Sequence, residues 1–306
     1  MLGWRCRLEA MPWYKGNTHT HSYVSDGDSS PPVVCAWYKS HGYDFLCMTD
    51  HNHPFDAAWL AGTDIADSSF LVIPGVEITT VAEGLPVHLN GLGISAMPEL
   101  PLYSSITALL QGSIDRIRAL GGVPIVNHPN FYWALNAKHL LDLKNCNLFE
   151  IWNASTNCNN IGAGGKPSTD DFWDNLSQAG QTWHGIASDD AHDFGSEFWG
   201  YKSLPGQAFV VVNCEKLEQT HILAALEAGD FYSSTGVMLT SLEMSAGRIK
   251  LEIKAEHHYA YTAELVASDG KILETQFGSS IEFIAPLGSR VRVFDSNGSR
   301  LWTNKA

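Results

Sequence analysis

Short apolar runs alternate with longer amphipathic stretches over the first 240 residues of the chain. Most of the apolar runs end on a polar residue or a polar cluster. Runs of this length, rich in β-branched and aromatic residues, predict buried strands. The predicted strands are residues 44–48, 70–73 continuing into 76–78, 87–92, 123–126, 148–152 and 182–187.

Three of the stretches between or after these strands predict helices. A helix is expected from Pro31 to Gly42, because Ser30 can cap it and proline costs least at a helix start. A second helix is expected over 104–120, where two glycines follow, and a third over 221–229. Strands that alternate with helices predict a mostly parallel α/β barrel or sheet.

The pattern changes from about residue 242, where apolar and polar positions alternate within short segments. Glycine turn pairs such as Asp269-Gly270 and Asn297-Gly298 separate these segments. The sequence therefore predicts an α/β domain over residues 1–240 and a small antiparallel β appendage over 241–306. Segment 230–236 is predicted to be a loop. The predicted appendage strands are 249–253, 263–266, 280–283 and 291–294.

The composition is that of a globular protein, with 44% hydrophobic and 17% charged residues. The 33 acidic and 19 basic residues give a formal charge of −14, which disfavours nucleic acid polymers and anionic membranes as partners. No membrane span and no signal peptide are expected from the apolar pattern. The six cysteines form no Cys-x-x-Cys pair and are expected to be free thiols, which predicts a cytoplasmic location.

Potential metal ligands end one predicted strand after another. His19 and His21 are one residue apart on an extended segment, so both imidazoles point to the same side. Asp26 follows beside a glycine that permits a tight turn. Chemistry in α/β folds lies at the C-terminal ends of strands, where later residues can converge with this pair. The candidates are His19, His21, Asp26, Asp50, His51, Glu77, His88, His128, Asp190 and His192.

Each candidate alone has a simpler explanation. Asp50 could cap a helix, Asp26 could form a turn, and His88 could be a hydrogen-bonded interior histidine. Their joint occurrence at one edge of a fold favours a metal site instead. Imidazole and carboxylate ligands suit Zn²⁺, Mn²⁺ or Fe²⁺. The set is large enough for two or three divalent ions, with a carboxylate such as Glu77 as a bridge.

Two other catalytic motifs are absent or incomplete. Segment 162–168 resembles a phosphate loop, but Asn160 replaces its first glycine and Pro167 follows its lysine, so a flexible loop beside the site is expected. No Gly-x-Ser-x-Gly elbow is present, which disfavours a serine nucleophile. Aromatic residues and lysines that could contact substrate are Tyr132, Trp133, Trp152, Phe194 and Trp199, with Lys166 and Lys202. Packing in the core explains the aromatic residues about as well.

Several of these residues belong to longer motifs that occur in order between Trp13 and Val237. The motifs are Gly16–His21 with Ser25–Ser29, His41–Phe45 leading into Thr49–Asn52, Ile73–Glu77, Val87–Asn90, Asn127–Pro129, Ala187–His192 and Ala228–Gly236. In these motifs the chain resembles the PHP (polymerase and histidinol phosphatase) superfamily of metallohydrolases. Within it, the chain is most similar to the CehA/McbA-like branch. The β appendage lies outside the resemblance.

The resemblance implies a distorted seven-stranded β/α barrel of the TIM type, with two or three divalent ions at the strand C-termini. It assigns His19, His21, Glu77 and Asp190 to the first ion. The second ion would share Glu77 and add His88 and His128. The third ion would be held by Asp26, His51 and His192.

Such ions would make a hydroxide available at neutral pH to attack phosphorus or a carbonyl carbon. Asp50, Asp189 and His192 are the candidates to pass the proton to the leaving group. The main hypothesis is a phosphoesterase that acts on a small phosphorylated substrate, the commonest activity implied by the superfamily. A carboxylic ester, carbamate or amide hydrolase, as the CehA/McbA-like branch suggests, is the first alternative. A non-catalytic, metal-stabilised binding module is the second.

Overall fold

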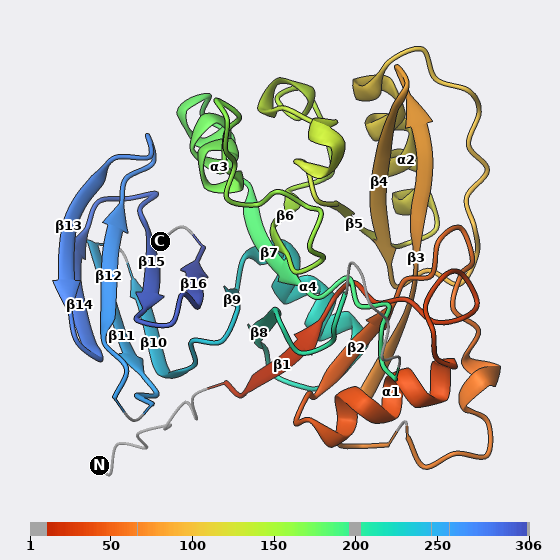
Figure 1. Ribbon diagram of the computed structural model, residues 1–306, viewed down its shortest axis with the longest axis horizontal. Coiled ribbons are helices and arrows are strands. Elements are labelled where there is room, and N and C mark those ends of the chain that lie inside the picture. The colour runs from red at the N-terminus through yellow and green to blue at the C-terminus, as the bar shows by residue number, and fades with distance from the viewer. Residues whose placement is uncertain (1–10, 66, 196–202, 246, 257, 305–306) are drawn as a thin grey trace, which may run out of the picture.

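The computed structural model describes residues 11–304, apart from 66, 196–202, 246 and 257. Two of the substrate-contact candidates, Trp199 and Lys202, therefore lie outside the described residues. One large sheet runs through the molecule, and a smaller sheet packs on its C-terminal end (Figure 1). The strand order is β13-β12-β15-β16-β9-β8-β1-β2-β3-β4-β5-β6-β7 in the large sheet and β10-β11-β14 in the small one.

The strands and helices have the following bounds. The strands are β1 Trp13–Asn17, β2 Phe45–Met48, β3 Leu71–Ala82, β4 Leu85–Leu92, β5 Val123–Val126, β6 Leu148–Asn153, β7 His184–Ser188, β8 Phe209–Asn213, β9 Phe231–Ser234, β10 Leu239–Ser245, β11 Gly247–Ile253, β12 Tyr261–Val266, β13 Ile272–Phe277, β14 Ser280–Ala285, β15 Arg290–Asp295 and β16 Arg300–Thr303. The helices are α1 Pro31–Ser40, α2 Ile106–Ala119, α3 Thr169–Gln178 and α4 Gln219–Ala228, with short 3-10 turns at Ala57–Leu60, Phe131–Trp133 and Ala137–His139.

The N-terminal part of the large sheet is mixed, which corrects the prediction of mostly parallel strands. Helices α1, α2 and α4 form close to their predicted positions. Four neighbouring pairs are parallel, namely β1–β2, β2–β3, β5–β6 and β6–β7. Four others are antiparallel, namely β1–β8, β3–β4, β4–β5 and β8–β9.

A long hairpin explains part of this difference. Strand β3 pairs with β2 as far as Pro74, continues in a ladder with β4, and keeps one parallel bridge, His51 with Glu77, to the segment that follows β2. Glu83 and Gly84 join the two strands with φ of 54° and 77°, the left-handed backbone that a tight hairpin turn requires. Glu77 and His88 therefore lie inside strands and not at their ends as predicted. They still reach the same edge, because this part of the hairpin projects beyond the end of β2 (Figure 1).

Segment Phe231–Ser234, predicted to be a loop, is strand β9 between β8 and β16. Its Ser233 hydroxyl donates a hydrogen bond to the Gly185 carbonyl at 2.7 Å and accepts one from the Ala187 N–H at 2.9 Å. A side chain thus bridges β7 and β9. Within the described ranges, β7 forms no backbone ladder with β8 or β9, so the sheet is open here and the predicted closed seven-stranded barrel is not observed.

The C-terminal strands continue the large sheet, because β16 pairs with β9. The predicted strands of this part are confirmed as β11, β12, β14 and β15, and β10, β13 and β16 are added to them. Apolar residues of the small sheet, such as Leu251 and Phe283, share one core with Ala263 and Val293 of the large sheet. The domain division at residues 240 and 241 stays a prediction.

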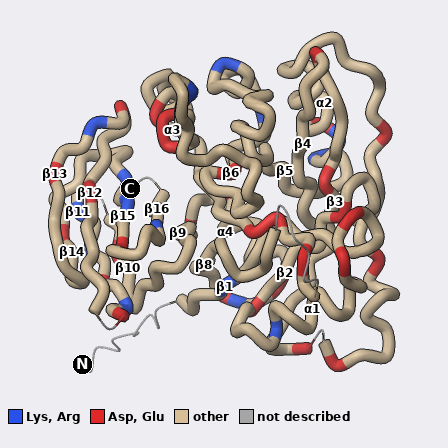
Figure 2. Tube along the Cα trace, viewed as in Figure 1, with Lys and Arg blue, Asp and Glu red and all other residues tan. Residues whose placement is uncertain are grey.

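Helix α3 joins the C-terminal strands to the rest of the molecule. The fully buried Arg290 forms an ion pair with Asp174, and its guanidinium lies 4.4 Å from the centroid of the Trp173 ring. Nearby, the Trp302 indole donates a hydrogen bond to Asp170 at 3.1 Å. Figure 2 shows this complementarity as basic positions on β15 beside acidic positions on α3. None of the described helices has the length and hydropathy of a membrane span.

Removal of Asp174 is expected to destabilise the protein strongly, because it leaves the buried Arg290 guanidinium without a carboxylate. We expect Asp174→Ala to lower the free energy of unfolding by about 3–5 kcal/mol in chemical denaturation. The double variant Asp174→Ala/Arg290→Met should regain part of this loss. Glu282→Ala, which breaks an exposed pair with Arg248, is the control and should change stability little. Equal stabilities for Asp174→Ala and the control would contradict the role of this pair.

Candidate metal centre

Four potential ligand atoms from three parts of the sequence meet at one point. They are His19 Nε2, His21 Nε2, Glu77 Oε2 and Asp190 Oδ1, and five of the distances that join them lie between 3.0 and 3.4 Å. A tetrahedral ion with bonds near 2.0–2.1 Å places its ligands about 3.4 Å apart. The two carboxylate oxygens are buried and accept no well-formed hydrogen bond from the described residues. The four atoms therefore fit a divalent cation.

The backbone brings these residues together although β1 and β7 are not neighbours in the sheet. The Asp190 N–H donates to the His19 carbonyl at 3.0 Å, and the His21 N–H donates to the Ala191 carbonyl at 2.9 Å. Asp190 has a φ of 50°, a left-handed conformation that aspartate tolerates better than bulky residues do. The segments after β1 and β7 thus meet at the predicted C-terminal edge.

The second oxygen of Glu77 faces a different set of side chains. Its Oε1 lies 3.1 Å from His88 Nδ1 and 3.3 Å from His128 Nε2. It also accepts a hydrogen bond from the Asn127 amide at 2.8 Å. Glu77 is fully buried, and its two oxygens divide the surrounding imidazoles into two groups. This is the arrangement expected of a carboxylate that bridges two ions.

A third group lies on the solvent side and contains Asp26, His51 and His192. The Asp26 carboxylate lies 3.5 Å from His51 Nε2 and 3.3 Å from His192 Nε2. His51 Nδ1 contacts Glu77 Oε2 at 2.7 Å, which links this group to the first one. The side chain of Asp26 is 54% exposed, whereas that of Glu77 is 1% exposed. All nine predicted ligands therefore lie in one connected cluster.

Charges within the cluster shift the pKa values of its members in opposite directions. Burial alone would raise the pKa of Glu77, but the imidazoles of His19 and His88 hold it well below its usual range. Burial alone would lower the pKa of His51, but the Asp26 and Glu77 carboxylates raise it to about 10. In contrast, burial and the charge of His192 lower the pKa of His21 to about 4. Divalent ions would displace protons from the protonated imidazoles, so their binding is coupled to proton release.

Glu150, in the middle of β6, was missed by the sequence analysis. Its Oε1 lies 2.8 Å from His19 Nδ1 and also accepts a 2.5 Å hydrogen bond from the Ser188 hydroxyl. Its Oε2 accepts hydrogen bonds from the His128 N–H and the Asn153 amide. A carboxylate on the far nitrogen of a ligand histidine fixes the orientation of the ring. The available signal was a single acidic residue inside an otherwise apolar strand.

Asp50 and Asp189, predicted as candidates for proton transfer, hold loops in the structure. Both oxygens of Asp50 accept hydrogen bonds from the backbone and hydroxyl groups of Ser22 and Ser25, which shapes the loop that carries Asp26. The oxygens of Asp189 accept hydrogen bonds from Tyr38 and from three successive N–H groups of residues 206–208. Burial raises the pKa of Asp189 to about 6, against the lowering effect of these donors.

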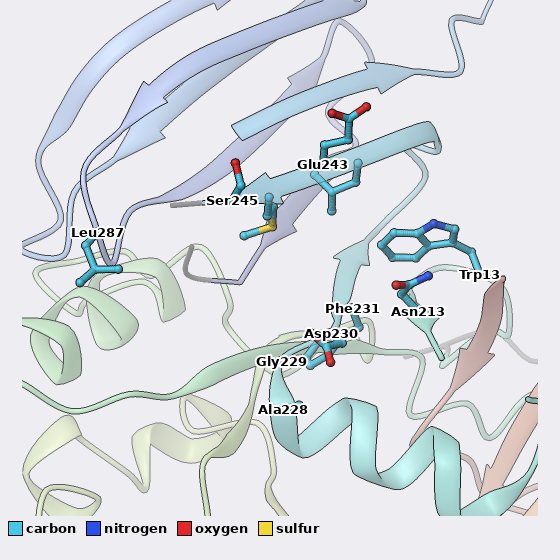
Figure 3. A pocket seen from close by; sticks show the side chains of 11 residues that line it. Trp13, Asn213, Ala228, Gly229, Asp230, Phe231, Glu243, Ser245 and Leu287 are labelled. Atoms are coloured by element: carbon cyan, nitrogen blue, oxygen red, sulfur yellow. The ribbon is translucent and has the colours of Figure 1, made fainter. Parts of the chain in front are cut away.

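A cavity of about 630 Å³ lies elsewhere, between β10 on one side and the start of β1, the end of β8 and the turn between α4 and β9 on the other. Figure 3 shows Trp13 and Asn213 on one side of this cavity and Glu243 and Ser245 on the other. Trp13 begins β1, whereas the ligand residues follow the end of β1 at Asn17. The cavity is therefore separate from the metal centre.

Replacement of Glu150 is expected to weaken metal binding, although Glu150 is not itself among the proposed ligands. Glu150→Gln keeps the shape of the side chain but removes the charge that orients His19 and Ser188. We expect a loss of at least tenfold in metal affinity, measured by competition with a chelator. The exposed Glu243→Gln on β10 is the matched control and should bind metal as the wild type does. Unchanged affinity in Glu150→Gln would show that Glu150 serves packing alone.

Sequence comparisons relate part of the chain to a known protein. No family model matches the chain. A 5'-3' exoribonuclease of Haemophilus influenzae is 32% identical over 99 residues, which are 32% of this chain and 33% of that protein. The chain therefore matches about one third of the length of this relative.

A crystal structure of a two-domain protein from Bacteroides vulgatus, described as containing a predicted PHP-like metal-dependent phosphoesterase, resembles the whole molecule. The TM-score is 0.54 at 15% identity, and the match covers 99% of this chain and 100% of that one. At 15% sequence identity, the structural similarity is evidence for a shared fold alone. It confirms, at the level of the fold, the predicted resemblance to the PHP superfamily, and the CehA/McbA-like branch stays a prediction.

Proposed function

We propose that the protein is a divalent-metal-dependent phosphoesterase with at least two ions. The observation that carries this proposal is Glu77, whose two buried oxygens serve two different groups of imidazoles. His19, His21 and Asp190 would complete the first site, and His88 and His128 the second. Ions bound there would supply an activated water and Lewis-acid stabilisation of charge on the substrate. Asp26, His51 and His192 would hold a third, more exposed ion.

The chain's own residues would orient these groups and move the proton. His192 Nδ1 donates to the Asp190 carbonyl at 2.8 Å, which leaves Nε2 directed toward Asp26 and partly accessible to solvent. His192 is therefore our first candidate to protonate the leaving group when it does not hold an ion. The saturated hydrogen bonding of Asp50 and Asp189 favours positioning roles for these two residues.

Two features favour a phosphoester over a carbonyl substrate. The name of the Haemophilus influenzae relative, a 5'-3' exoribonuclease, implies cleavage of phosphodiester bonds. A cluster of imidazoles that could hold several cations offers the positive charge that a phosphate group requires. The net charge of −14 disfavours a long polyanion, so we propose a small phosphorylated substrate. An ester, carbamate or amide hydrolase remains the alternative, because the same activated water could attack a carbonyl carbon.

Hydrolysis assays on a substrate panel distinguish these functions. The protein loaded with Mn²⁺ or Zn²⁺ is expected to hydrolyse p-nitrophenyl phosphate or bis-p-nitrophenyl phosphate faster than 1-naphthyl esters or carbamates. Glu77→Gln should lose at least 100-fold in kcat/KM, since it removes the charge shared by both sites, an effect on the order of 3 kcal/mol. Circular dichroism would verify that this variant is folded. Activity on carbonyl substrates alone would overturn the phosphoesterase proposal. Full activity in folded Glu77→Gln would overturn the metal mechanism.

Elemental analysis of variants tests how the ligands are divided among the ions. We expect Asp26→Asn to lose no more than one ion per chain after reconstitution, because the two imidazoles nearest to Asp26 are those of His51 and His192 in the exposed group, and His21 of the first group lies farther away at 3.7 Å. Glu77→Gln should lose more metal than Asp26→Asn, because its carboxylate contacts all three groups. The assignment fails if Asp26→Asn binds no metal, or if Glu77→Gln retains as many ions as the wild type.

A further inference from the structure

The turn that follows His128 holds two large aromatic residues in an unfavourable backbone conformation. Tyr132 and Trp133 have φ of 50° and 56°, in the left-handed region that bulky residues rarely adopt. Tyr132 also has 68% of its surface exposed, so burial of its ring does not compensate for the strain. Strain of this kind persists where the surrounding structure enforces it, and it concentrates at functional sites.

Side-chain amides of two loops enforce this turn. The Asn130 amide donates to the carbonyls of Asn159 and Pro167, at 3.1 and 2.9 Å. The Asn159 amide donates back to the Asn130 carbonyl at 3.2 Å, and this carbonyl also accepts from the Trp133 N–H at 3.0 Å. The turn is therefore fixed against the loop that follows β6.

The turn lies directly beside the second group of candidate ligands. The Phe131 ring is 5.0 Å from the His128 ring and 5.8 Å from the His88 ring, centroid to centroid. The Tyr132 ring follows at 4.8 Å from Phe131 in an edge-on arrangement. Lys166, from the glycine-rich loop, places its ammonium 5.7 Å from the centroid of the Trp133 ring. An exposed ring and a positive charge thus belong to the same turn whose Phe131 ring packs against His88 and His128.

We propose that Tyr132 forms a stacking surface for the leaving group of the substrate. The preferred substrates are then phosphoesters whose leaving group carries a planar aromatic ring, with Lys166 adding positive charge at the same turn. The face of an exposed aromatic side chain can stack on many different planar rings, because each of them has a π-face. Each such stack contributes substantially to binding affinity. This inference deepens the proposed function and rests on it for the nature of the bond that is cleaved.

Binding of two phosphonates that cannot be hydrolysed tests the stacking surface independently of turnover. On Mn²⁺-loaded protein, phenylphosphonate and methylphosphonate share the anionic group and differ in the ring. We expect the wild type to bind phenylphosphonate about tenfold more tightly, the lower range for a ring stacked on an aromatic side chain. Tyr132→Ala should lose this preference while its affinity for methylphosphonate changes less than twofold, and Tyr132→Trp should retain the preference. Tyr259→Ala, at an exposed tyrosine of the C-terminal part, is the matched control and should bind as the wild type does.

A stability measurement separates stacking from a structural role of the same residue. Tyr132→Gly removes both the ring and the cost of the left-handed backbone, so it should melt at a higher temperature than Tyr132→Ala and yet show no preference for phenylphosphonate. The proposal is overturned if the wild type binds both phosphonates equally or not at all, or if Tyr132→Ala keeps the preference. Failure of the phosphoesterase proposal would appear separately, as absence of hydrolysis of both p-nitrophenyl phosphate and bis-p-nitrophenyl phosphate with the phosphonate preference intact.

Discussion

Burial of the Glu77 carboxylate is the constraint on which the rest of the site depends. An ionised carboxylate that leaves water costs several kcal/mol unless nearby groups compensate its charge. Here the compensation comes from imidazoles of different segments, with His19, His21 and His51 around one oxygen and His88 and His128 near the other. The segments that follow β1, β2 and β5, together with β4, each contribute at least one imidazole to this one group. In the proposed site, this carboxylate would lie between two cations.

The cluster of candidate ligands was predictable from the sequence because most of its members follow buried strands, although Glu77 and His88 lie inside strands. His19 and His21 follow β1, and Asp190 and His192 follow β7 with the same spacing. Glu150 was not predictable by this rule, since it lies inside β6 among apolar neighbours and faces His19 only after β6 and β1 are placed in space. Asp50 and Asp189 show the opposite case. Their position beside ligands suggested proton transfer, but their oxygens accept hydrogen bonds that hold two loops.

The elements were predicted where the local pattern decides them and missed where distant partners do. Apolar runs specified β2, β5 and β6, but no periodicity indicates that β4 runs antiparallel to β5 or that β8 runs antiparallel to β1. Segment 230–236 contains the polar and glycine residues typical of a loop, but Phe231–Ser234 within it becomes a strand because β8 and β16 provide backbone partners on both sides. The opening of the sheet between β7 and β9 was also not predictable from local patterns. A closed barrel was predicted, but hydrogen bonds of the Ser233 side chain connect β7 and β9 in place of a backbone ladder.

The location of bound ions tests the central claim, a carboxylate shared between two cations, most directly. Anomalous diffraction from crystals of the Mn²⁺- or Zn²⁺-loaded protein would locate each ion without reference to activity. The account predicts one peak among His19, His21, Glu77 and Asp190 and a second beside His88 and His128, with one Glu77 oxygen directed at each. A single peak, or two peaks that do not share Glu77, would contradict it.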